Sequence, residues 1–78
     1  MYMHKMNEIS DRVKEASALA SMQRMLEKYS VKYNIPFDKA MEKYASSESY
    51  SALFNYETAL WREGPDYLLQ WFEQETIK

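Results

Sequence analysis

Apolar side chains recur at helical spacing along most of the chain. In the first half they lie three or four residues apart: Ile9, Val13, Ala16, Leu19, Met22, Leu26, Tyr29 and Tyr33. Such steps place side chains on one face of an α-helix. The pattern predicts a long helix that begins near Asn7 or Ser10 and ends at about Tyr33. No segment alternates apolar and polar residues in the manner of a β-strand.

A second, shorter helix is predicted after a break at Ile35 and Pro36. The residue before a proline avoids the α-helical region, so Ile35 should be extended. Pro36 suits the first turn of a new helix, and Asp38 favours its N-terminus. The apolar spacing predicts that this helix ends near Ala45.

Two further helices are predicted in the last third of the chain. Serines 46, 47 and 49 are N-cap candidates for a third helix, and the only glycine, Gly64, suits its C-cap. Pro65 and Asp66 then begin a fourth helix, which we expect to fold back against the third. These segments predict an all-α fold, a small bundle of about four helices. We expect one helical domain over residues 1–78, with no fixed structure in residues 1–8.

The composition narrows the class of protein. The 78 residues suffice for one domain, and there is no cysteine for a disulfide. Residues 1–6 lack the apolar run of a signal peptide, and no stretch approaches the roughly 20 apolar residues that cross a bilayer. We therefore expect a cytoplasmic protein that binds no membrane.

Catalysis and cofactor binding are not predicted. The only imidazole is His4, and zinc sites need several nitrogen or sulfur ligands at set spacings. A single glycine excludes a glycine-rich phosphate loop. The carboxylates of Asp38 and Glu42 alternate with lysines, as on a solvated helix face. We expect no enzyme activity, no metal site and no cofactor.

A helix-turn-helix DNA-binding regulator is the alternative function, because the second and third helices have roughly the required lengths. The first turn of its recognition helix would offer Glu48, Ser49, Tyr50 and Ser51, a set with a negative charge and no Arg or Lys. Arg24, Lys28 and Lys32 form a basic stripe that could contact phosphates or be a solvated face. The net charge of −2 argues against nucleic acid as the main partner.

Aromatic side chains concentrate in the C-terminal half, and most must form core in so short a chain. Trp and Tyr also dominate the energetics of binding surfaces. We predict an apolar contact face of Trp61, Tyr67, Trp71 and Phe72, with Arg62 at its rim. Trp71 and Tyr67 should be partly exposed in the monomer. The expected function is a non-catalytic protein-interaction module that binds another protein or itself.

Self-association as a homodimer without another partner is a further alternative. Residues 1–46 carry eight Lys or Arg and six Asp or Glu, a balance of +2. Residues 47–78 carry two Lys or Arg and six Asp or Glu, a balance of −4. Opposite potentials on two halves of a chain can steer two copies together.

The stretch from about Leu26 to Glu75 resembles a bacterial family, domain of unknown function number 3791. The residues on which this resemblance rests are Tyr29, Ile35, Ala40, Met41, Tyr50, Leu53, Tyr56, Leu60-Trp61-Arg62-Glu63-Gly64 and Asp66-Tyr67-Leu68. This chain has Trp61 where the family often has histidine, so no role of that histidine carries over, and Pro65 follows the glycine. The resemblance implies a small helical bacterial accessory protein, such as an antitoxin-like one, and no known chemistry.

Overall fold

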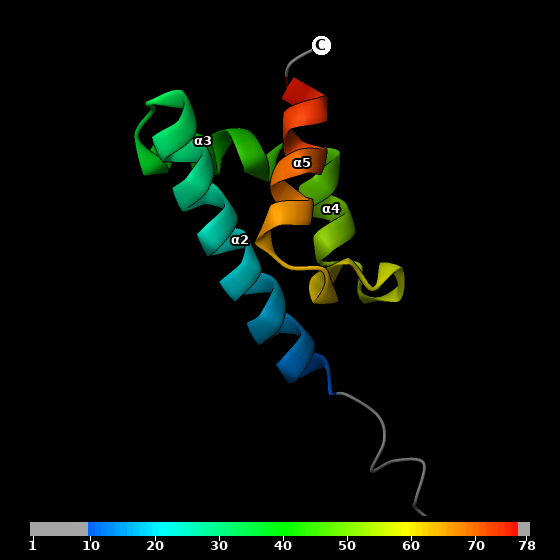
Figure 1. The fold of residues 1–78 in the computed structure, drawn as a ribbon. Coiled ribbons are helices and arrows are strands. Elements are labelled where there is room, and N and C mark those ends of the chain that lie inside the picture. Colours follow the sequence, from blue (N-terminus) through cyan, green and yellow to red (C-terminus); the bar gives the residue numbers. More distant parts are fainter. Residues whose placement is uncertain (1–9, 77–78) are drawn as a thin grey trace, which may run out of the picture.

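The computed structural model describes residues 10–76, which form four α-helices and two short 3₁₀ turns (Figure 1). The helices are α2 (Asp11–Tyr33), α3 (Phe37–Ala45), α4 (Glu48–Leu53) and α5 (Pro65–Thr76). The 3₁₀ turns η1 (Tyr56–Thr58) and η2 (Leu60–Arg62) connect α4 to α5. The predicted all-α class is confirmed. The prediction for residues 1–8 lies outside the described residues.

Local hydrogen bonds fix both ends of α2. The Ser10 hydroxyl accepts a hydrogen bond from the Val13 backbone N–H at 3.3 Å, as an N-cap does. At the other end Asn34 adopts the left-handed conformation with φ 56°, which asparagine tolerates better than most residues. Of the two predicted starts, Ser10 is the N-cap of α2, while Asn7 lies outside the described residues, and the predicted end at about Tyr33 is confirmed.

The part of α2 from Ala18 onward carries most of the central packing. Its buried residues are Ala18, Met22, Met25, Leu26 and Tyr29, and α3, η2 and α5 all pack against the helix. The first turns of α2 extend beyond the shorter elements (Figure 1). Val13 and Leu19 are 51% and 44% exposed, and Leu19 directly follows the fully buried Ala18, so its side chain points away from the buried side of the helix. The predicted apolar stripe is correct for Met22, Leu26 and Tyr29, which are buried, and for half-buried Tyr33. It is wrong for Val13, Ala16 and Leu19, which are exposed, and Ile9 lies outside the described residues.

A short turn joins α3 to α4. Pro36 is the N-cap of α3, one residue before the helical position that the sequence predicts for it. Ser47 is the N-cap of α4: its hydroxyl accepts from the Tyr50 N–H at 3.0 Å and donates to the Tyr44 carbonyl at 2.6 Å. The Ser47 hydroxyl thus bonds to the last turn of α3 and to the first turn of α4, while Ser46 is the C-cap of α3.

The predicted long third helix is wrong, because α4 ends at Leu53 and two 3₁₀ turns follow. The Asn55 side chain accepts from the Glu57 N–H at 3.2 Å, and the Thr58 hydroxyl donates to the Ala52 carbonyl at 2.8 Å. Such side-chain bonds to the backbone compete with helical hydrogen bonds. Ala59 then takes φ 59°, which no right-handed helix contains.

Gly64 occupies a different place from the predicted one. Its φ of 92° confirms the need for glycine, but it follows η2 and does not cap a long helix. Its carbonyl accepts from the Leu68 N–H at 3.4 Å, so Gly64 acts as the N-cap of α5. The chain reverses at this point, and α5 packs against both α2 and α4.

An aromatic cluster holds the helices together at the centre. The Phe72 ring of α5 lies 4.7 Å from the Tyr29 ring of α2 and 4.9 Å from the Tyr44 ring of α3, measured between centroids. Phe72 and Tyr44 are fully buried, and Tyr29 is 3% exposed. Tilted and edge-to-face pairs of this kind add to the stabilisation from burial.

Candidate functional site: the outer face of α5

One surface of α5 carries four uncharged side chains around an open hollow of about 340 Å³. They are Tyr67, Gln70, Trp71 and Gln74, which we call the α5 outer face. Their spacing of three, four and seven residues places them on one side of a helix. Tyr67 is 48% exposed, Gln70 and Gln74 are exposed, and Trp71 is half-buried.

The packing of α5 explains why this side stays open. Leu68 and Phe72 are fully buried and turn the opposite side of the helix into the core. In Figure 1, α5 lies beside α2 and against α4, so neighbours cover it on two sides. The remaining side carries exposed Tyr67 and half-buried Trp71, which line the open hollow.

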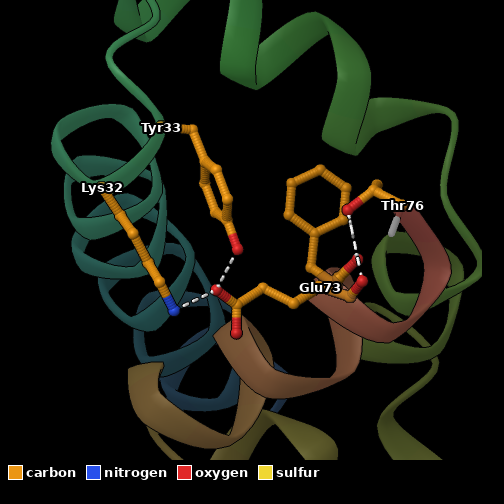
Figure 2. A network of polar contacts seen from close by, with 5 residues as sticks. Lys32, Tyr33, Glu73 and Thr76 are labelled. Carbon is orange, nitrogen blue, oxygen red and sulfur yellow. Dashed lines mark hydrogen bonds and ion pairs between the residues drawn. The ribbon is translucent and has the colours of Figure 1, made fainter. Parts of the chain in front are cut away.

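Ion pairs with α2 form one border of the α5 outer face. The Lys28 ammonium lies 2.8 Å from the Asp66 carboxylate, and the Lys32 ammonium lies 2.5 Å from that of Glu73. Figure 2 shows Lys32 and Tyr33 pointing toward Glu73, and the Tyr33 hydroxyl donates to the same carboxylate at 2.6 Å. Both acidic groups on this border therefore already have a cationic partner.

This cluster shifts the pKa values of its members. The hydrogen bond from Lys32, followed by that from Tyr33, lowers the pKa of Glu73 below its ordinary 4.5. The hydrogen bond to the Glu73 carboxylate raises the pKa of Lys32 and also that of Tyr33. At neutral pH the lysine and the glutamate are both charged, so this border carries no net charge from the pair.

The substitution Glu73→Gln should reduce the loss of stability in acid. Because folding lowers the pKa of Glu73, its contribution is present above pH 4.5 and is lost as the pH falls through the folded-state pKa. The wild-type protein should therefore lose more unfolding free energy between about pH 7 and about pH 3 than the variant does. Urea unfolding followed by circular dichroism measures both values.

A matched control is Glu57→Gln, which removes an exposed carboxylate that forms no ion pair within residues 10–76. The flattening of the pH dependence should be larger in Glu73→Gln than in this control. Equal pH dependence in wild type and Glu73→Gln would contradict a stabilising role for the Lys32–Glu73 pair.

On the other border of the α5 outer face, toward α4, the carboxylate of Glu75 forms a hydrogen bond that joins the two helices. Glu75 accepts a hydrogen bond from the Ser49 backbone N–H at 2.9 Å, in the first turn of α4. A negative group is favoured there by the helix dipole. Beneath it, the fully buried Tyr44 and Ser49 hydroxyls are hydrogen-bonded at 2.9 Å, and burial raises the pKa of Tyr44 to about 12.

The structure separates the five predicted contact residues into three places. Tyr67 and Trp71 lie together on the α5 outer face, which is where the sequence predicted partial exposure. Phe72 is 0% exposed and belongs to the core, so its assignment to a contact face is wrong. A residue one position after Trp71 points about 100° away on a helix, which carries Phe72 inward.

Trp61 and Arg62 lie on η2, where they form a separate pair. Trp61 is only 9% exposed and has two cations near its ring: the Lys14 ammonium and the Arg62 guanidinium are each 5.8 Å from the ring centroid. Arg62 is exposed. Trp61 is therefore a core residue with two cations near its ring, and the prediction that it is part of an open apolar face is wrong.

Sequence reasoning missed Gln70 and Gln74. Glutamine gives no apolar signal, and the prediction followed the aromatic residues alone. The signal that could have found them is their spacing, because both share one helix side with Tyr67 and Trp71.

The geometry of α4 is unlike that of a recognition helix. It has six residues, and Ser49 in its first turn is fully buried. Glu48 and the hydrogen-bonded Glu75 carboxylate place two negative charges at its N-terminus, where a phosphate backbone would be repelled. In the basic stripe, Lys28 and Lys32 are already paired with carboxylates of α5.

No group of three or more His, Asp or Glu that could hold a metal occurs in residues 10–76, and His4 lies outside that range. No helix of this part of the chain has the length and apolar character needed to cross a membrane.

Comparison of the chain with protein-family models, curated proteins and solved structures found no match. The resemblance to the bacterial family stays a prediction.

Proposed function

We propose that this protein is a non-catalytic interaction module and that the α5 outer face is the surface with which it binds another protein. The observation that carries the proposal is the exposure of Tyr67 beside half-buried Trp71, around an open hollow with Gln70 and Gln74. Large aromatic side chains in such a setting provide most of the binding energy of many protein interfaces.

The chemistry of the α5 outer face suits binding more than reaction. Its four side chains offer two aromatic rings, a phenol hydroxyl and two amides, and none of them is charged at neutral pH. Rings supply apolar contact area, and amides both donate and accept hydrogen bonds. This combination resembles the centre of an interface, where charged residues are depleted.

The resemblance to the bacterial family extends this proposal. A protein of this kind would serve as a small accessory protein, for example one encoded beside the protein that it binds, as antitoxins are. The α5 outer face would then be the surface that the accessory protein presents.

The substitution Trp71→Ala should weaken association more than it lowers thermal stability. Tagged wild-type protein and the variant are used to capture partners from a nuclease-treated lysate, and thermal unfolding of both is followed by circular dichroism. The matched control is Val31→Ala on α2, because Val31 is 82% exposed and lies outside the α5 outer face. Association that survives Trp71→Ala, or that falls only in step with stability, would contradict the proposal.

A further inference from the structure

We propose that the segment bound by the α5 outer face is proline-rich and adopts the polyproline II conformation, lying along α5 over the hollow. This inference rests on the proposed function and names the class of partner for that same surface. It is carried by the arrangement of the four side chains around the hollow, by their hydrogen-bonding groups and by the lack of charge among them.

The four side chains of the α5 outer face form two walls along the helix axis. At about 100° per residue, Trp71 lies about 40° around the helix from Tyr67, and Gln74 lies about 40° around it from Gln70. Gln70 lies about 60° to the other side of Tyr67. Counted around the helix, the order is therefore Gln70, Gln74, Tyr67 and Trp71. The hollow thus has amides along one wall and aromatic rings along the other.

The length of this surface suits an extended segment. Tyr67 and Gln74 are seven residues apart, so they lie about 10.5 Å apart along the helix axis and about 20° apart around it. One turn of a polyproline II helix contains three residues and rises by about 9.3 Å. A segment laid along α5 would therefore place equivalent residues of successive turns near Tyr67 and near Gln74.

The hydrogen-bonding groups of the hollow match those of a proline-rich chain. Proline has no backbone N–H, so each prolyl residue offers a carbonyl acceptor and an apolar ring. The polyproline II backbone forms no internal hydrogen bonds, which leaves these carbonyls free. The amides of Gln70 and Gln74, the Tyr67 hydroxyl and the Trp71 indole N–H can all donate to them. Prolyl rings would contact the aromatic wall while carbonyls accept from the amide wall.

Other modes of peptide recognition need features that the α5 outer face lacks. A bound strand requires an exposed sheet edge, and residues 10–76 contain no strand. Acidic or phosphorylated motifs are bound by arginine clusters, and no side chain around the hollow is charged. A bound helix inserts a row of apolar anchors into an apolar groove, whereas Gln70 and Gln74 make one whole wall of this hollow polar. Polyproline II segments bind to grooves lined by aromatic rings, which the Tyr67 and Trp71 wall provides.

Charge complementarity also favours an uncharged segment. Prolyl side chains carry no charge, and neither do the four side chains that they would contact. The carboxylates on the α2 border, Asp66 and Glu73, are each paired with a lysine of the same molecule. The dissociation constant should therefore change by less than about twofold between about 50 mM and about 500 mM salt, because screening acts on interactions between charges.

The size of the contact predicts a modest affinity. α5 has 12 residues and is about 18 Å long, so one face of it is smaller than the roughly 800 Å² per partner of a standard stable interface. A polyproline II segment is already ordered before it binds, which reduces the entropic cost of binding. We expect a dissociation constant between about 10 μM and about 1 mM.

Titration of a capped oligoproline of about ten residues into the full chain tests the inference. Backbone amide shifts in nitrogen–proton NMR spectra should change saturably, and the changes should centre on residues 67–74. A capped Gly-Ser peptide of the same length is the control probe, because it is uncharged but has neither prolyl rings nor an ordered backbone. It should bind at least about tenfold more weakly than the oligoproline.

Variants test the two walls separately. Tyr67→Ala removes a ring from the aromatic wall and should raise the dissociation constant at least about fivefold. The matched control is Phe37→Ala on α3, which removes a ring that is 42% exposed, against 48% for Tyr67, and should leave the constant unchanged. Gln74→Leu keeps a similar size but removes the amide, so it should raise the constant at least about threefold. Circular dichroism confirms that all three variants are folded.

The outcomes separate this inference from the proposed function. An oligoproline that gives no saturable shifts up to about 5 mM, or that binds no better than the Gly-Ser peptide, overturns the proline-rich partner. Binding that ignores Tyr67→Ala and Gln74→Leu does the same. If Trp71 is still required to capture a protein from a lysate, the proposed function stands. A neutral maltodextrin that binds to the hollow where oligoproline does not would make the ligand a sugar, and both proposals are then wrong.

Discussion

Replacing Phe72 with alanine is expected to lower the free energy of unfolding by about 3–5 kcal/mol, the largest effect of any single substitution considered. Phe72 is fully buried, and its ring lies between Tyr29 of α2 and Tyr44 of α3. Its removal leaves a cavity where three helices meet. A domain of this size has a small stability margin, so much of the Phe72→Ala protein should be unfolded at 37 °C.

Urea denaturation followed by circular dichroism measures this loss. The control is Phe37→Ala, which removes the same ring from a position that is 42% exposed and should cost about 1 kcal/mol or less. Phe72→Leu should fall between the two because it refills part of the cavity. A Phe72→Ala protein about as stable as wild type would show that Phe72 lies on a surface after all.

The second large effect concerns the buried pair of hydroxyls. Tyr44→Phe should lower the free energy of unfolding by about 1–3 kcal/mol, because it leaves the Ser49 hydroxyl buried without its partner. Ser49→Ala should lower the free energy of unfolding by a similar amount, because it leaves the Tyr44 hydroxyl buried without its partner. Both residues are 0% exposed, and their oxygens lie 2.9 Å apart.

The double variant distinguishes a hydrogen bond from simple packing. Removing both hydroxyls leaves no unpaired group, so the Tyr44→Phe, Ser49→Ala protein should lose much less than the two single losses added together. Denaturant unfolding of the four proteins gives this coupling directly. Losses that simply add would mean that the two hydroxyls do not depend on each other.

The helices that the sequence predicted well are those whose starts or ends carry a local signal. Ser10 provides an N-cap, and the break at Ile35 and Pro36 follows the end of α2. For α5, Gly64 and Pro65 mark the start. These residues act through their own backbone preferences, so the sequence is sufficient to place them.

The region between α4 and α5 was not predictable from apolar spacing. Leu53, Leu60 and Trp61 are spaced as on one helix, and all three are buried, yet the chain between them is not an α-helix. The spacing reports which side chains enter the core and not the backbone route between them. That route depends on Asn55 and Thr58, whose bonds to the backbone compete with a helix.

The candidate site was only partly predictable. Tyr67 and Trp71 were identified by residue type, but Phe72 was assigned to the same surface although it is fully buried. Which side of α5 faces the core depends on where α2 and α4 lie, and that is decided by contacts between residues far apart in sequence. Glu73 and its pairing with Lys32 illustrate this, because 41 residues separate them.

The uneven covering of α2 has a consequence for how the protein opens. Amide hydrogen exchange requires a local opening, and the energy of that opening follows the contacts that must be broken. In the first turns of α2, Val13 and Leu19 are exposed, so the backbone there can unwind with little loss of burial. Around Met25 and Tyr29, opening disrupts the central packing. We therefore expect the backbone amides of the first turns of α2 to exchange faster than those from Met22 to Tyr29, which should open only together with the packing against α5.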